Sequence, residues 1–190
     1  MHPATTFGAF LAVTASLSFS ASVLAQDASH IRLRYDTFNP RVTVPEIPAT
    51  LRSDKTERLF IVQFEATPTA LDRAALAAKN AEIHGYLPDD AYVVRMSAGR
   101  AEDVRSVPSV RWVGHYHAAY RLDPALTRAL AAGELGEARY NIVVVDKHND
   151  KPALGAQIRA LGGRVDDEHT GSLLFSATVT PQQLVATAHL

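Results

Sequence analysis

The chain has 190 residues, no cysteine, and 19 Lys and Arg against 20 Asp and Glu. The absence of cysteine excludes disulfides, thiolate metal sites and cysteine nucleophiles. Because the charges nearly cancel and form no basic run, nothing favours binding to a phosphate backbone, and we expect no nucleic-acid partner.

An apolar, uncharged segment opens the chain. Residues 7–24 are mostly Ala, Leu, Val, Phe, Ser and Thr, and small residues occupy the usual positions before a cleavage point at Ala25. The pattern predicts a signal peptide over residues 1–25 and a secreted or periplasmic product that does not contact a membrane after cleavage. Because no Lys or Arg precedes this segment, an uncleaved N-terminal anchor is the alternative. Its Ser and Thr content argues against a spanning helix.

Residues 26–57 differ in composition from the rest of the chain. Pro40, Pro45 and Pro48 exclude a long helix and favour an extended arm with turns. Within the arm, Ile31–Tyr35 alternates apolar and basic residues, which predicts a short edge strand.

A first module is predicted over residues 58–122. Residues 59–64 form an apolar run typical of a central strand, and Thr67 followed by Pro68 predicts the N-cap and first position of a helix. A hairpin over residues 83–96, a helix from Ser97 and a strand over 110–114 complete the order βαββαβ. This is the ferredoxin-like arrangement, in which two helices cover one face of an antiparallel sheet.

A helical linker over residues 123–138 leads to a second module over 139–190. The elements of the first module recur in the same order, and Gly162-Gly163 is a strong helix stop. The last element is a helix that begins at Thr180-Pro181, and no counterpart of strand 110–114 follows it. The sequence therefore predicts an α+β fold of two tandem ferredoxin-like modules, the second lacking its last strand. We interpret the second module as truncated, because such a sheet has an unpaired edge.

Several stretches resemble a known family. They are Val62–Phe64, Gly85–Arg95, Val110–Gly114 and Ala118–Leu126 in the first module, and residues 160–165 and 180–190 in the second. The chain is similar to the N-terminal pro-region, built of tandem ferredoxin-like propeptide modules, that precedes the catalytic domain in many secreted bacterial subtilisin-like serine proteases. The resemblance implies that the modules assist folding of a catalytic domain beyond Leu190 and restrain it. That domain would be the partner, bound within the same chain.

The catalytic motifs of that family are not present in these residues. Asp72 precedes Arg and Asp146 precedes Lys, so neither begins the family's Asp-Ser/Thr-Gly motif, and no Gly-Thr-Ser occurs. We predict no catalytic, cofactor-binding or metal-binding residue and no cofactor. Two histidine-bearing stretches, His115 with His117 and Asp166–His169, are metal-site alternatives, but neither has a recognised ligand spacing. Trp112 is expected to pack in a core or between domains.

Two other functions stay open at this stage. A stand-alone secreted protease inhibitor or protein-binding module is the runner-up, since such modules also act independently. A hydrolase complete within 190 residues would need a Ser/His/Asp triad assembled from scattered residues, because geometry rather than sequence order defines a triad.

Overall fold

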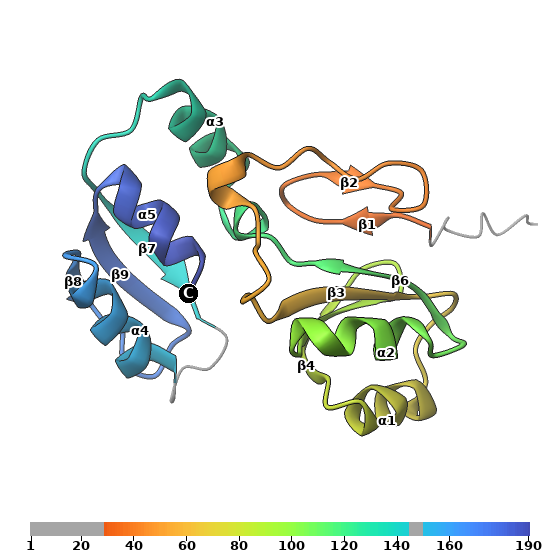
Figure 1. The fold of residues 1–190 in the computed structure, drawn as a ribbon. Coiled ribbons are helices and arrows are strands. Elements are labelled where there is room, and N and C mark those ends of the chain that lie inside the picture. Colours follow the sequence, from red (N-terminus) through yellow and green to blue (C-terminus); the bar gives the residue numbers. More distant parts are fainter. Residues whose placement is uncertain (1–28, 145–149) are drawn as a thin grey trace, which may run out of the picture.

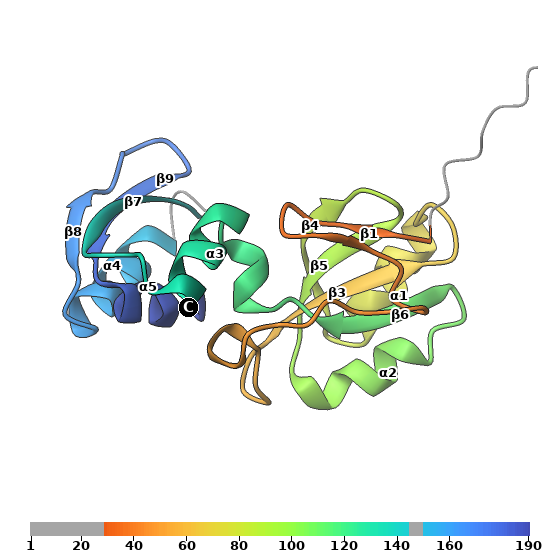
Figure 2. The ribbon, with the colours of Figure 1, turned by 90° about the horizontal axis from the view of Figure 1, so that it is seen from above.

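The computed structural model describes residues 29–144 and 150–190. The predicted signal peptide lies outside these residues. The chain folds into two α+β modules side by side, as Figures 1 and 2 show. Among the described helices, none combines the length and apolarity that a membrane crossing requires. The fold class predicted from the sequence is confirmed.

The first module is a four-stranded antiparallel sheet with the strand order β4-β5-β3-β6. Its elements are β3 (Leu59–Phe64), α1 (Ala70–Ala78), β4 (Glu82–Leu87), β5 (Ala91–Arg95), η2 (Ala98–Arg100), α2 (Ala101–Arg105) and β6 (Val110–His115). Alternate residues of β3, among them Phe60 and Val62, point toward the helices and are buried with Leu76 of α1 and Val104 of α2. This order and layering are ferredoxin-like.

Helix α1 begins two residues later than the sequence pattern predicts. Its N-cap is Thr69, and Thr67 lies outside the helix. The side chains of Thr69 and Asp72 form a reciprocal capping box, which satisfies two backbone donors at the helix start. Hydrogen bonds from Ser109 and Thr69 lower the pKa of Asp72 to about 2. The prediction of Thr67 as N-cap was therefore wrong, because Thr69 has an acidic residue at the position that closes the box.

The arm is a layer of the first module. It contains β1 (Ile31–Arg32), β2 (Thr37–Phe38) and η1 (Ala49–Leu51). The arm lies on the face of the sheet opposite α1 and α2 (Figure 1), where Ile31 and Phe38 are buried with Ile61 of β3. The predicted strand Ile31–Tyr35 was wrong in its extent, since a turn in which Leu33 N–H donates to Asp36 O ends the strand.

The second module is a three-stranded antiparallel sheet with the order β7-β9-β8. The first module ends with η3 (Ala118–Arg121), and the linker contains α3 (Pro124–Ala132). The module then contains β7 (Ala138–Val143), α4 (Asp150–Ala160), β8 (Arg164–Asp167), β9 (Leu174–Val179) and α5 (Pro181–Ala188). In the first module, β6 lies beside β3. Among the described residues, no strand occupies the corresponding position beside β7 in the second module. The predicted lack of a last strand is confirmed.

The two modules share one apolar cluster. It joins Phe38 of the arm and Tyr120 of η3 to Phe175 of β9, Ile158 of α4 and Leu184 of α5. Helix α5 lies next to η1 and η3. Helix α5 therefore contacts the first module, whereas α4 and β8 lie on the far side of the second module (Figure 1).

Candidate functional site

The arm is fixed to the first module by polar contacts as well as by its buried side chains. Arg32 pairs with Asp89 at 2.5 Å, and Asp89 lies in the β4–β5 turn with the left-handed backbone of a tight hairpin. The amide of Gln63 on β3 donates to His30 O at 3.0 Å and to Asp89 O at 3.3 Å. The outer face of this sheet is thus closed by the chain itself.

Trp112 lies beneath this arm. Its ring meets Phe38 edge-on, with centroids 6.3 Å apart and an interplanar angle of 82°. A side chain at Gly114 would collide with the Trp112 ring, since a Cβ there would lie 2.2 Å from it. The expected packing role of Trp112 is confirmed.

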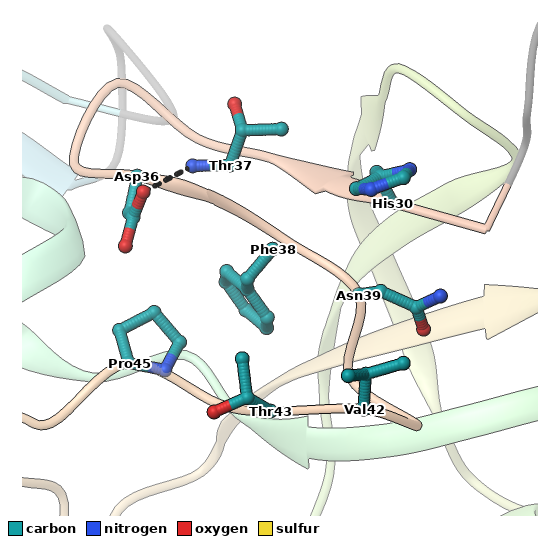
Figure 3. A pocket seen from close by; sticks show the side chains of 8 residues that line it. All are labelled: His30, Asp36, Thr37, Phe38, Asn39, Val42, Thr43 and Pro45. Atoms are coloured by element: carbon teal, nitrogen blue, oxygen red, sulfur yellow. Dashed lines mark hydrogen bonds between the residues drawn. The ribbon is translucent and has the colours of Figure 1, made fainter.

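A shallow pocket of about 390 Å³ lies within the arm (Figure 3). Its lining comes from the β1–β2 hairpin and the segment after it, and consists of His30, Asp36, Thr37, Phe38, Asn39, Val42, Thr43 and Pro45. Its two titratable side chains, His30 and Asp36, lie at opposite ends in Figure 3, and Asp36 accepts the Thr37 N–H at 2.7 Å. The pocket is therefore mainly apolar, and its His30 and Asp36 side chains are too far apart to act as an acid–base pair.

A charged cluster lies where the two modules meet. Glu57 is nearly buried, pairs with Arg121 at 3.3 Å and contacts His189 Nδ1. The other ring nitrogen of His189 lies 2.9 Å from Thr50 O, and Arg121 donates to Ala188 O at 2.8 Å. Burial lowers the pKa of Arg121, and the Glu57 carboxylate opposes that shift. The cluster connects the end of α5 to the arm and to η3.

The first predicted metal alternative, His115 with His117, lies beside this cluster. The two rings are stacked with centroids 5.9 Å apart, and His117 Nδ1 accepts the Ser53 N–H at 3.0 Å. Burial and the neighbouring His115 lower the pKa of His117 to about 4. Nδ1 is therefore used as a backbone acceptor, and the pair is a packing element.

The second alternative, Asp166–His169, is divided among separate partners. Asp166 pairs with Arg164 at 2.9 Å, Glu168 with Arg159 at 3.6 Å, and Asp167 with His169 at 3.3 Å. Within residues 29–144 and 150–190, no three His, Asp or Glu side chains are grouped as metal ligands.

The structure brings together a Ser/His/Asp constellation that the sequence did not indicate. His169 Nε2 lies 2.8 Å from Ser176 Oγ, and His169 Nδ1 lies 3.3 Å from Asp167 Oδ2. These distances resemble those of a catalytic triad. However, Ser176 is fully buried, and its hydroxyl donates to Asn141 Oδ1 at 2.9 Å.

The direction of that bond decides what the constellation can do. A nucleophilic serine must donate its proton to the histidine, whereas Ser176 directs its proton to Asn141. A substrate also cannot reach an oxygen that is fully covered. The network therefore braces the β8–β9 hairpin against β7. Strand alternation alone indicates that Asn141 and Ser176 share a face, because they are register partners.

Among the described residues, the outer face of the second sheet is exposed or partly exposed except at Ser176. The residues that point to it carry mostly polar side chains, among them Arg139, Arg164 and Thr178, with Asp166 hydrogen-bonded between them. At the other end of the same face lie two apolar side chains that are register partners, Val143 and Leu174, which are 73% and 36% exposed. An apolar spot beside polar residues is typical of a contact surface.

One family model matches the chain. Residues 32–117 match a family described as "Domain of unknown function (DUF8729)". The match begins in the arm and runs through β6, so it treats the arm and the first module as one unit, in agreement with their shared packing. No curated protein and no solved structure matches the chain.

Proposed function

We propose that this chain is the exported pro-region of a subtilisin-like serine protease, which assists folding of a catalytic domain that follows residue 190 and restrains it. The observation that carries the proposal is the asymmetry of the two sheets. The arm occupies the outer face of the first sheet, whereas among the described residues most side chains on the outer face of the second sheet are exposed. A pro-region that lays a sheet face on its enzyme would therefore dock through the second module.

The surface for this docking centres on Val143 and Leu174, which are register partners on the outer face. Val143 is 73% exposed and Leu174 is 36% exposed, and the Val144 N–H donates to Leu173 O at 2.9 Å, so the backbone beside them is held in the sheet. Burying the two side chains would contribute roughly 1–3 kcal/mol each to the complex. Arg139 and Arg164, at the other end of the same face, would set its orientation rather than its strength.

Refolding of the catalytic domain tests this proposal. A denatured subtilisin-like catalytic domain from the same precursor is diluted with or without residues 26–190, and recovered peptidase activity is measured. We expect the chain to raise the recovered activity at least tenfold. The double variant Val143→Asp, Leu174→Asp should lose most of that gain.

The matched control is Leu71→Asp. Leu71 is 82% exposed on α1 of the first module, away from the proposed surface, and its variant should assist refolding as the unchanged chain does. Equal recovery of activity with and without the chain would contradict the proposal. Equal loss in both variants would place the contact elsewhere.

A stand-alone secreted protease inhibitor or protein-binding module is the second candidate. The observation that favours it is the cluster of Glu57, Arg121 and His189, which ties the end of α5 to the first module. An independent binder should be monodisperse and unfold in one cooperative step. A pro-region without its enzyme should show separate, earlier melting of the second module.

A further inference from the structure

A short segment at the junction of the modules, residues 50–57, is held from two sides by histidine side chains. His189, at the end of α5, contacts this junction segment from the second module, and His117, at the start of η3, contacts it from the first. Glu57, the last residue of the segment, is nearly buried and accepts the Ser53 hydroxyl proton at 3.2 Å. Both contacts depend on the protonation state of the histidine that makes them.

His189 directs both of its ring nitrogens at acceptors. Its Nδ1 contacts a carboxylate oxygen of Glu57, and its Nε2 lies 2.9 Å from Thr50 O. A neutral imidazole has a single N–H, so it can donate to one of these oxygens and turns a lone pair toward the other. The imidazolium ion donates to both. The contact between α5 and the junction segment is therefore complete only when His189 carries a proton on each nitrogen.

His117 has the opposite requirement. Its Nδ1 accepts the Ser53 N–H at 3.0 Å, and a backbone N–H cannot donate to a ring nitrogen that already holds a proton. Burial, and then the neighbouring His115, lower the pKa of His117 to about 4, so the ring keeps its acceptor in mild acid. The contact between η3 and the junction segment is therefore complete only while His117 is neutral.

The charged groups around the two histidines are arranged differently. Arg121 pairs with one carboxylate oxygen of Glu57 at 3.3 Å, and the other oxygen contacts His189. Hydrogen bonds from Thr56 lower the pKa of Asp54, and the charge of His189 adds to this shift, so a second carboxylate also favours the His189 cation. Other titratable or charged groups near the cluster are Arg52, Arg95, Arg105, His115, Tyr116 and Tyr120.

We propose that the junction of the modules is a latch with a pH window: it is closed where His189 is protonated and His117 is neutral, and it opens on either side of that window. Histidines lose their proton between about pH 5 and 8. Docking of the second module favours the protonated form of His189, so the latch weakens as the pH rises through this range. Protonation of His117 sets the acid limit, because it displaces the Ser53 N–H. The latch consists of contacts within the chain and does not depend on the protease proposal.

Energy transfer between fluorescent dyes on the two modules tests the latch. The chain has no cysteine, so the dyes attach only at Leu71→Cys on α1 and Leu161→Cys after α4, which replace exposed residues. Residues 26–190 carry a neutral Gly-Ser tail, so that no terminal carboxylate lies next to His189. From about pH 6 to about pH 8.5, the fraction of molecules with separated modules should rise about tenfold, as expected when a hydrogen bond to a charged group is lost. It should also rise toward about pH 4, where His117 gains its proton.

Substitutions separate the two limits of the window. His189→Gln has no charge to lose and should be open at all these pH values, whereas His189→Arg keeps a charge and should stay closed at about pH 8.5. His117→Asn places an oxygen near the position of Nδ1, so it should remain closed near pH 4 and still open in alkali. The matched control is His84→Gln, because His84 lies on β4 and pairs with Glu82 at 3.6 Å. This variant should keep the profile of the unchanged chain.

The protonation states can be read directly from the imidazole nitrogen shifts in NMR. At about pH 6, His189 should carry two N–H groups and His117 should have an unprotonated Nδ1. A neutral His189 at this pH, or a separated fraction that does not change with pH, would overturn the proposal. Opening that persists at high pH in His189→Arg or at low pH in His117→Asn would also overturn it, because the titrating group would then be another side chain.

Discussion

Truncation of Phe38 tests whether the arm is an integral layer of the first module. Phe38 is 4% exposed and its ring contacts Trp112 and Tyr120, with centroids 6.3 and 6.4 Å apart. Replacing a buried Phe by Ala costs about 3–5 kcal/mol. We take about 3 kcal/mol, because the ring also borders an open pocket. A loss of that size shifts the docking equilibrium of the arm by roughly a hundredfold.

The only tryptophan reports this equilibrium, since Trp112 lies under the arm. In Phe38→Ala, acrylamide should quench Trp112 fluorescence more strongly, and the amides of residues 29–51 should exchange faster. Val42→Ala is the control in the same arm, because Val42 is 79% exposed. Unchanged quenching and exchange in a folded Phe38→Ala variant would refute the assignment of the arm as a structural layer.

Three further predictions concern the polar clusters. The pKa of His117 falls from 6.5 to about 4 on folding, so between these pH values the unfolded chain binds more protons than the folded chain. The contribution of His117 to the free energy of unfolding should therefore be largest above pH 6.5 and decrease as the pH falls toward 4. The loss should be about 1–2 kcal/mol after allowance for the half-exposed ring, and a flat pH profile in urea unfolding would contradict it. Glu57→Gln should destabilise the junction of the modules by about 2–3 kcal/mol in thermal unfolding, because Arg121 loses its charged partner. The control is Glu102→Gln in an exposed ion pair, which should change the stability by less than about 0.5 kcal/mol. Ser176→Ala should cost about 1–2 kcal/mol through the lost bonds to Asn141 and His169, and any esterase activity that disappeared with this variant would contradict the bracing role.

The order of elements follows from local patterns and could be predicted. The apolar run of residues 59–64, the stop at Gly162-Gly163 and the start at Thr180-Pro181 act within a few residues, and the structure places β3, the end of α4 and α5 accordingly. Pro68 predicted the start of α1 less reliably, because the capping box of Thr69 and Asp72 places the N-cap at Thr69 rather than at Thr67.

The position of the arm could not be predicted, because it depends on contacts between residues distant in sequence. Arg32 and Asp89 meet only when the β4–β5 turn and the β1–β2 hairpin are both formed. The constellation of Asp167, His169 and Ser176 likewise depends on a bulge in β8 and on the positive φ of 44° at His169. Neither feature has a residue signature, since His169 is not a residue type that favours such a backbone as strongly as glycine does.

The coding sequence after codon 190 tests the central claim most directly. If the chain is a pro-region, the reading frame should continue with a strand of alternating apolar residues, which would fill the slot beside β7. The Asp, His and Ser motifs of a subtilisin-like catalytic domain should then come in that order. A stop codon directly after Leu190 would contradict the pro-region proposal and leave the stand-alone binder as the better explanation.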